Sequence, residues 1–220
     1  QRGRRWERIT SMSRLRAVLW DFGGVILASP FEAFNHYERD HGLPVDFIRT
    51  VNATNPHDNA WAHLERSQIS AAQFADEFAA ESEALGHRVD GNAVLGLLAG
   101  EVRPEMVAAL DVVKAAGYKT ACLTNNIVSY DDAPPRPDVA DALARFDALI
   151  ESAKVGVRKP EPRFYEIACE VLDVHPDECV FLDDLGINLK TARQMGMTTI
   201  KVVSSDQARA ELGALLDMEL

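Results

Sequence analysis

The segment at residues 17–26, AVLWDFGGVI, constrains the fold of this chain more than any other stretch. Its first four residues are apolar and predict a buried strand, and Asp21 follows where that strand ends. Gly23 and Gly24 then allow a sharp turn, because glycine reaches positive φ angles at little cost. In a parallel α/β sheet, ligands bind outside the carboxyl ends of the strands, so this position favours a functional Asp21. A simple turn or cap role for Asp21 is the alternative.

Later apolar stretches end in polar residues in the same way. Thr124 and Asn125 follow one such stretch, and Asp183 and Asp184 follow another. Alternating strand and helix patterns from residue 101 onward predict an α/β fold with a doubly wound, parallel, Rossmann-like sheet. If the strands are parallel neighbours, their polar ends meet at one edge of that sheet.

The segment between the first strand and residue 101 has a helical pattern with no clear strand. Ser70 is a good N-cap for one of its helices. We expect a core domain over residues 13–28 plus 101–220, an inserted helical cap over 29–100, and a tag or upstream extension at 1–12. Three prolines and two acids within residues 127–137 favour an irregular surface loop. The cap helices are expected at residues 31–37, 44–51, 59–66, 71–84 and 91–98.

Composition narrows the classes of partner and location. The formal net charge of −11 disfavours nucleic acid and anionic membranes as partners. No apolar run approaches the about 20 residues that a membrane span needs. Cys122, Cys169 and Cys179 lie in apolar segments without metal-ligand spacing, which favours reduced thiols and a cytoplasmic location. The sequence leaves monomer and homodimer equally open.

Asp21, Asp183 and Asp184 together predict a cation site. Three carboxylates in a small volume repel one another, and the pKa of each rises unless a positive group lies among them. Oxygen ligands without histidine or thiolate favour a hard cation, most simply Mg²⁺. A magnesium ion that keeps several waters suits phosphate chemistry.

Lys159, in the stretch VGVRKPEP, offers a second positive charge at this edge of the sheet. A solvated surface lysine is the alternative, since lysine is mostly exposed in proteins. Arg158 is the adjacent cation, but the Lys-Pro step is held extended and is the better candidate. We therefore expect Lys159, and not Arg158, to balance the carboxylates.

The remaining groups at the strand ends are hydrogen-bond donors. Thr124 and Asn125 carry donors that suit a phosphate oxygen, with a plain turn as the alternative. Gly23 and Gly24 leave backbone N–H groups bare beside Asp21, which suits an oxyanion. A nucleophile, a metal, a charge clamp and hydrogen-bond donors are the parts of phosphoryl transfer.

Four motifs in order, LWDFGGV, CLTNN, GVRKPEP and VFLDDLGIN, resemble those of the haloacid dehalogenase-like (HAD) hydrolase superfamily. The helical insertion after the first strand resembles that family's cap of the first type. The second half of the chain, together with the first motif, also resembles the N-terminal phosphatase domain of soluble epoxide hydrolase and the related domain of an acyl-CoA dehydrogenase family member. The resemblance implies a HAD core with a helical cap, and it constrains the substrate less, because one fold hosts many functions.

The resemblance implies a role for each matching residue. Asp21 would be the nucleophile that forms an aspartyl-phosphate. Thr124, Asn125 and Lys159 would bind the transferring phosphoryl group of a small phosphorylated substrate.

The resemblance also implies a magnesium site. Mg²⁺ would be held by Asp21, the backbone carbonyl of Gly23 and Asp184. Asp183 would reach the ion directly or through water, and Asn188 would orient the acidic loop.

One position departs from the family's pattern. Phosphatases of this family usually carry an aspartate two residues after the nucleophile as general acid, where this chain has Gly23. Such proton transfer is worth about 10²–10⁴-fold in rate. Three functions therefore stay open: a Mg²⁺-dependent phosphatase, a slow or inactive relative that binds a phosphorylated ligand or a protein partner, and a metal-independent 2-haloacid dehalogenase. The candidate substrate-facing residues are Phe22, Phe31, His36, Trp61 and His63.

Overall fold

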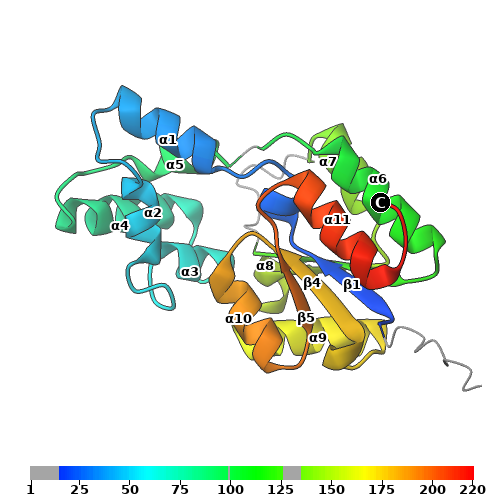
Figure 1. The fold of residues 1–220 in the computed structure, drawn as a ribbon. Coiled ribbons are helices and arrows are strands. Elements are labelled where there is room, and N and C mark those ends of the chain that lie inside the picture. Colours follow the sequence, from blue (N-terminus) through cyan, green and yellow to red (C-terminus); the bar gives the residue numbers. More distant parts are fainter. Residues whose placement is uncertain (1–14, 99, 126–134) are drawn as a thin grey trace, which may run out of the picture.

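The structure is a computed structural model that describes residues 15–98, 100–125 and 135–220. It contains a parallel sheet with helices on both faces and, beside it, a smaller group of helices (Figure 1). The extension expected at residues 1–12 lies outside the described residues, as does most of the loop expected at 127–137.

The sheet has five parallel strands with β1 at its centre. Trp20, the last residue of β1, pairs with Cys122 on one neighbouring strand and with Leu182 on the other. The polar residues that follow these positions therefore emerge at the same edge, which confirms the predicted doubly wound parallel sheet. The strand order is β3 (Ala148–Glu151), β2 (Lys119–Thr124), β1 (Ala17–Trp20), β4 (Cys179–Asp183) and β5 (Thr198–Lys201).

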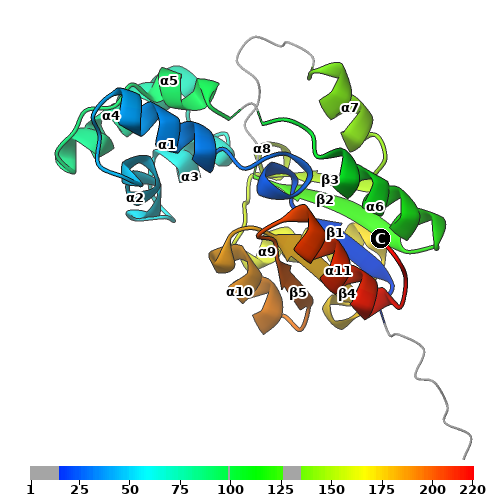
Figure 2. The ribbon, with the colours of Figure 1, turned by 45° about the horizontal axis from the view of Figure 1, so that its top comes forward.

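Helices cover the sheet on both faces (Figures 1 and 2). Val18 and Trp20 of β1 point into one apolar core, whereas Ala17 and Leu19 point into the other. All four residues of β1 are buried, as expected of a strand covered on both sides. The first core is closed by α6 (Pro104–Ala115), α7 (Pro137–Leu143) and α11 (Ser205–Leu216), and the second by α9 (Pro162–Leu172) and α10 (Gly186–Gln194).

The inserted helices have an apolar core of their own. Trp61 packs edge-on against Phe74, with ring centroids 4.7 Å apart. Ser70 accepts a hydrogen bond from the backbone of Gln73 in a capping box, which confirms the predicted N-cap. Each predicted cap helix is found within one helical turn of its predicted bounds. The cap helices are α1 (Phe31–Asp40), α2 (Phe47–Ala53), α3 (Ala60–Glu65), α4 (Ala71–Ala84) and α5 (Gly91–Gly96).

Two adjacent linkers join the cap helices to the sheet domain. Leu27 and Val102 form an antiparallel bridge, and the Ala28 backbone N–H donates to the Glu101 carbonyl oxygen at 2.8 Å. Gly100 lies so close to Ala28 that a Cβ at that position would be 2.5 Å from the Ala28 carbonyl oxygen. The linkers are therefore packed against each other and not splayed apart.

Two short elements have no counterpart in the sequence analysis. They are α8 (Ser152–Val155), directly after β3, and the 3₁₀ turn η2 (Pro176–Glu178), directly before β4. Neither is long enough to show a helical periodicity in the sequence. Of the two, α8 bears on the site because it leads into the loop that carries Lys159.

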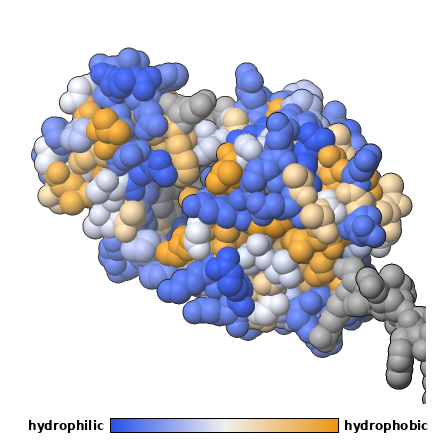
Figure 3. All heavy atoms as spheres, in the orientation of Figure 1, coloured by the Kyte–Doolittle hydropathy of each residue, from blue (hydrophilic) through white to orange (hydrophobic). Residues whose placement is uncertain are grey.

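Hydrophilic side chains predominate on the face of the molecule in Figure 3, with apolar side chains in smaller groups between them. Within the described residues, the helices are all too short or too polar to cross a membrane.

Candidate functional site

The carboxyl ends of β1 and β4 bring two carboxylates onto one buried ammonium group. Lys159 Nζ lies 2.6 Å from Asp21 Oδ1 and 2.8 Å from Asp183 Oδ2. Lys159 is 1% exposed and Asp183 is fully buried. The alternative of a solvated surface lysine is therefore wrong, because this side chain is enclosed by the residues that it neutralises.

The site holds more negative charge than its lysine can balance. Burial lowers the pKa of Lys159, but Asp183 and Asp21 outweigh burial and hold that pKa above its ordinary value, so the side chain is cationic. Burial raises the pKa of the Asp21 carboxyl well above its usual range, and Lys159 opposes this rise. Burial, and then Asp183, raise the pKa of Asp184 to about 6. Three carboxyl groups thus share one ammonium group.

Asp183 and Asp184 are neighbours in the sequence but have different surroundings. Both Asp183 oxygens accept hydrogen bonds from Asn188 Nδ2, at 3.1 and 3.0 Å, and the Leu185 N–H donates to Oδ1 at 2.7 Å. With Lys159 on its other oxygen, Asp183 is fully engaged in holding the site together. Asn188, predicted to orient the acidic loop, makes the contacts that such a role requires.

Asp184 lies against the glycine turn after β1. Gly24 has a φ of +77°, and a Cβ there would lie 2.3 Å from Asp184 Oδ2. A side chain at position 24 would therefore be strained and would also displace the carboxylate. The sequence indicated a turn at this glycine, and the structure adds the close approach of Asp184.

Gly23 occupies an open position in the same turn, η1 (Phe22–Ile26). Its φ of −68° and ψ of 131° are accessible to any residue, and a Cβ there would meet no atom within 4 Å. A longer side chain thus fits at position 23 without backbone strain. The preceding Phe22 N–H donates to Asp21 Oδ1 at 2.7 Å and fixes the nucleophile candidate at the start of the turn.

Asn125, at the end of β2, holds the loop that carries Lys159. Its Nδ2 donates to the Lys159 carbonyl oxygen at 3.0 Å, and the Lys159 N–H donates to Asn125 Oδ1 at 2.8 Å. Both polar atoms of the amide are therefore used on the backbone of Lys159. Thr124 is half-buried at the same strand end. Phosphate binding by Thr124 and Asn125 stays a prediction.

Two residues that support the site were not singled out by the sequence. Tyr165 Oη donates to the Asn188 carbonyl oxygen at 2.9 Å, so α9 braces the start of α10. Arg103 Nη1 donates to the Gly24 carbonyl oxygen at 3.1 Å and ties α6 to the glycine turn. Buried tyrosines and helix-flanking arginines are common, so no local pattern marks these roles.

The residues present fit a divalent cation. Ligand oxygens of Asp21, Asp183 and Asp184 all lie within 4.8 Å of one another, the only group of three or more acidic, histidine or cysteine side chains this close in residues 15–98, 100–125 and 135–220. The donors are all oxygens, which is the ligand set that Mg²⁺ prefers. A cation there would also balance the excess charge. Because Asp183 already accepts hydrogen bonds from Lys159, Leu185 and Asn188, Asp184 is the better placed ligand of the two adjacent aspartates.

Of the candidate substrate-facing residues, two lie in apolar cores and one is exposed. Phe22 is buried in the core beneath the turn, and Trp61 belongs to the cap core against Phe74. His36 is exposed on α1.

The other two make contacts within the cap. His63 lies between Glu77, 3.0 Å from Nδ1, and Asp58, 2.9 Å from Nε2. The Arg49 guanidinium stacks 4.1 Å above the Phe31 ring. The substrate-facing role of all five residues stays a prediction.

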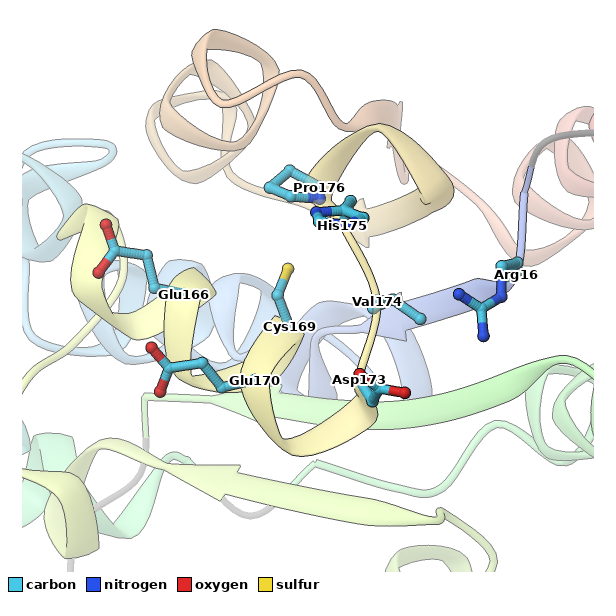
Figure 4. Close-up of a pocket in the computed structure, with 8 residues that line it drawn as sticks. All are labelled: Arg16, Glu166, Cys169, Glu170, Asp173, Val174, His175 and Pro176. Atoms are coloured by element: carbon cyan, nitrogen blue, oxygen red, sulfur yellow. The ribbon is translucent and has the colours of Figure 1, made fainter.

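A cavity of about 360 Å³ lies at the opposite end of the sheet (Figure 4). Arg16, just before β1, and His175, just before η2, help to line it, and the Cys169 thiol points toward His175. This cavity is at the amino ends of the strands, away from Asp21. The charged cluster at the carboxyl ends is the better functional site, because it unites buried ionisable groups with shifted pKa values.

A family model described as haloacid dehalogenase-like hydrolase matches residues 15–196. The chain is 33% identical over 227 residues to mouse acyl-CoA dehydrogenase family member 10, and 33% identical over 213 residues to mouse bifunctional epoxide hydrolase 2. These alignments cover 100% and 90% of the chain but 21% and 38% of those proteins, so the chain spans well under half of either.

A phosphatase from Mycobacterium tuberculosis is similar along almost its whole length. It is 30% identical over 220 residues, which are 92% of this chain and 97% of that protein.

Two solved structures share the fold. A HAD family enzyme from Bacteroides thetaiotaomicron, in complex with magnesium and inorganic phosphate, has a TM-score of 0.59 at 20% identity and covers 90% of this chain and 98% of its own. L-2-haloacid dehalogenase from Xanthobacter autotrophicus, with chloropropionic acid covalently bound, has a TM-score of 0.57 at 21% identity and covers 91% and 82%.

Proposed function

Because the chain belongs to the haloacid dehalogenase-like hydrolases, we propose that it is a Mg²⁺-dependent phosphatase that hydrolyses a small phosphomonoester through an aspartyl-phosphate on Asp21. One observation carries the proposal: Lys159 Nζ bridges Asp21 and Asp183, and Asp184 completes a compact carboxylate triplet beside them. The similarity to a mycobacterial phosphatase over 92% of the chain supports the same reaction class.

The proposed reaction begins at the free oxygen of Asp21. Lys159 and the Phe22 N–H both contact Oδ1, which leaves Oδ2 for attack on phosphorus. As the Oδ2–phosphorus bond forms, the bond between phosphorus and the ester oxygen breaks. The leaving alkoxide takes its proton from water, because Gly23 provides no acid. A water molecule then attacks phosphorus as the Oδ2–phosphorus bond breaks, and it gives a proton to the hydroxide left by the first step. Inorganic phosphate is released and the Asp21 carboxylate is restored.

The charged neighbours would hold the phosphoryl group and the cation. Lys159 is cationic and would balance negative charge as it develops. Mg²⁺ would be held by Asp21, the Gly23 carbonyl and Asp184, and when bound it supplies positive charge that screens the phosphoryl oxygens from the carboxylates. Asp183 would keep Lys159 oriented, because its own oxygens are occupied by Lys159, Asn188 and Leu185.

Two other functions have some support. Gly23 favours a slow relative that binds a phosphorylated ligand or a protein partner, since it removes the usual acid. The structural likeness to a haloacid dehalogenase favours a metal-independent dehalogenase at the level of fold. We rank the dehalogenase third, because three carboxylates with one ammonium group would repel an anionic haloacid unless a cation were present.

The proposal also covers the class of substrate and the cellular location. A net charge of −11 supports a small-molecule substrate over nucleic acid or an anionic membrane. Three buried free cysteines, Cys122, Cys169 and Cys179, support a reducing, cytoplasmic location.

The proposal is tested by p-nitrophenyl phosphate turnover with Mg²⁺ and with EDTA. The phenolate leaving group needs little proton assistance, so the missing acid matters least with this substrate. We expect turnover that needs Mg²⁺ and is lost in Asp21→Asn. Asp217→Asn, a matched change after α11 at the far end of the chain, is expected to keep full activity. Wild-type turnover no greater than that of Asp21→Asn would refute the phosphatase and direct attention to halide release and ligand binding.

A further inference from the structure

The loop that carries Lys159 is held from two sides. It connects α8 to α9 at residues 156–161. From the sheet side, Asn125 makes two hydrogen bonds to the Lys159 backbone. The other side of the loop faces the cap, where α3 lies beside α8 (Figures 1 and 2).

The first contact from the cap is an ion pair between Glu65 and Arg158. Arg158 Nε donates to Glu65 Oε2, and the two side chains are only 13% and 14% exposed. Arg158 Nη1 also donates to the Pro56 carbonyl oxygen at 2.9 Å, in the loop before α3. Arg158 is therefore directed away from the carboxylate cluster and into the cap, which explains why it is not a counterion of Asp21 or Asp183.

The second contact is an ion pair between Arg66 and Glu161. Arg66 Nε donates to Glu161 Oε1 at 2.8 Å, and the same oxygen accepts from the Arg158 N–H at 3.3 Å. The Arg66 side chain is largely buried, and Nη1 also donates to the Ala62 carbonyl oxygen of α3. The two ion pairs are thus joined through Glu161 into one network.

The charges of this network are reciprocal. The cap presents an acid and then a base, Glu65 and Arg66, at the end of α3. The loop presents a base and then an acid, Arg158 and Glu161, on either side of Lys159. Each cap residue therefore meets an opposite charge, and both contacts lie within two residues of Lys159.

We propose that Glu65 and Arg66 of the cap are positioning residues, which hold the 156–161 loop so that Lys159 Nζ bridges Asp21 and Asp183. Lys159 can neutralise two carboxylates only while its backbone stays at the carboxyl edge of the sheet. Asn125 fixes that backbone at Lys159 itself, and the ion pairs fix it immediately before and after. The cap then contributes to the geometry of the reacting groups as well as to access.

Burial increases the effect of breaking either ion pair. Removal of one partner from a buried pair leaves an uncompensated charge, which the structure can relieve only by moving. Of the two partners, Arg158 lies in a segment without helix or strand hydrogen bonds, whereas Glu65 is held in a helix. A broken pair is therefore expected to loosen the loop before it loosens α3.

The inference rests on the proposed function only for its kinetic test, so the first test is independent of activity. Two quantities are measured without metal in wild type, Glu65→Gln and Arg158→Gln. One is hydrogen–deuterium exchange of the peptide over residues 156–161, and the other is the rate at which a small acylating reagent modifies the Lys159 amine. We expect faster exchange and faster acylation in both variants. Arg163→Gln, which removes an exposed ion pair to Glu170 on α9, is the matched control and is expected to change neither.

The kinetic test shows whether the ion pairs position Lys159 or only attach the cap to the loop. Glu65→Gln is expected to lower kcat for p-nitrophenyl phosphate by about 10–100-fold, as small displacements of a catalytic group do, with a smaller change in KM. The double variant Glu65→Gln, Arg158→Gln should lose no more than either single variant, because the two residues act as a pair. The charge swap Glu65→Arg, Arg158→Glu should recover part of the loss.

The outcomes are distinguishable. Unchanged exchange and acylation in folded Glu65→Gln and Arg158→Gln would overturn the inference, as would equal changes in Arg163→Gln. Where either variant fails to fold, Glu161→Gln is measured in the same way. The Glu161 side chain is partly exposed, and its loss breaks the second ion pair to the cap. Loosened loop residues in a chain that has no phosphatase activity would refute the proposed function and leave the positioning of Lys159 standing.

Discussion

The carboxyl edge of the sheet and the cap contribute to the site in different ways. At the sheet edge, the site residues follow directly from strand register, because Trp20, Cys122 and Leu182 are paired and the polar groups come just after them. The cap has its own apolar core and reaches the site region through side chains at the end of α3. Backbone pairing fixes the positions of the aspartates, whereas we propose that the side-chain ion pairs hold the loop that carries Lys159. Changes at the sheet edge should therefore have larger effects than changes in the cap.

The largest expected effect comes from removal of the buried ammonium group. Lys159→Met leaves Asp21 and Asp183 without a counterion in a buried site, which is expected to cost about 3–5 kcal/mol of unfolding free energy. Turnover should fall by about 10²–10³-fold as well, from loss of charge stabilisation. Urea unfolding and kcat measure the two effects. Lys159→Arg is the control that keeps the charge. Unchanged stability in Lys159→Met would show that Lys159 is not the counterion of the pair.

The second prediction concerns the missing acid. A Cβ at position 23 meets no atom within 4 Å, so Gly23→Asp is expected to fold. A carboxyl group there should speed hydrolysis of an alkyl phosphate by up to about 10²–10⁴-fold, since alkoxides need a proton to leave. The rate with p-nitrophenyl phosphate should change much less. Gly23→Asn, which has the same shape and no proton to give, is the control. Equal rates for Gly23→Asp and Gly23→Asn would contradict the account of this position.

The third prediction separates the two adjacent aspartates. If Asp184 is a ligand as proposed, Asp184→Asn should weaken Mg²⁺ binding by about 10–100-fold or more. In EDTA the same change should raise stability slightly, since it removes a like charge from beside Asp183. Thermal unfolding with and without Mg²⁺ tests both points, because a ligand that binds the native state raises Tm. A Mg²⁺-dependent rise in Tm that persists in Asp184→Asn would exclude Asp184 as a ligand.

The smallest expected effect lies in the cap. The His63 ring donates hydrogen bonds to the Glu77 and Asp58 carboxylates, which raise the pKa of His63 above its ordinary value of 6.5. The folded state therefore binds this proton more tightly than the unfolded chain, so the extra stability is complete below pH 6.5 and is lost as pH rises through the raised pKa. The loss should be at most about 1 kcal/mol, because the pair is partly exposed. Urea unfolding of wild type and His63→Gln between pH 6 and 9, expected to differ in pH dependence, measures it. Parallel pH profiles would exclude this linkage.

The sheet edge could be predicted from the sequence because its signals are local. An apolar run followed by Asp21, or by Asp183 and Asp184, is visible within a few residues, and the four ordered motifs led to the family that the comparisons confirm. The parallel sheet follows from the same alternation of strands and helices. The family is thus inferred from the resemblance of the motifs, and the sheet from the spacing of apolar runs.

The remainder of the site depends on contacts between distant residues. Asp183 and Asp184 look alike in the sequence, and only the packing of Asn188 and Gly24 distinguishes them. The Glu65–Arg158 contact joins residues that are 93 positions apart. Charged residues are common at helix ends, so nothing in the sequence identifies that partner. The sequence distinguishes Lys159 from Arg158 as the counterion, but it gives no sign of the contact between Arg158 and the cap.

Borohydride trapping tests whether Asp21 carries the phosphoryl group during turnover. The chain is mixed with p-nitrophenyl phosphate and Mg²⁺, treated with sodium borohydride, and analysed by peptide mass spectrometry. An aspartyl-phosphate is reduced to homoserine, whereas a free carboxylate is not. We expect homoserine at position 21, formed only when both the phosphoester and Mg²⁺ are present. Phosphoester hydrolysis that leaves Asp21 unmodified, or that modifies another carboxylate in its place, would contradict this expectation.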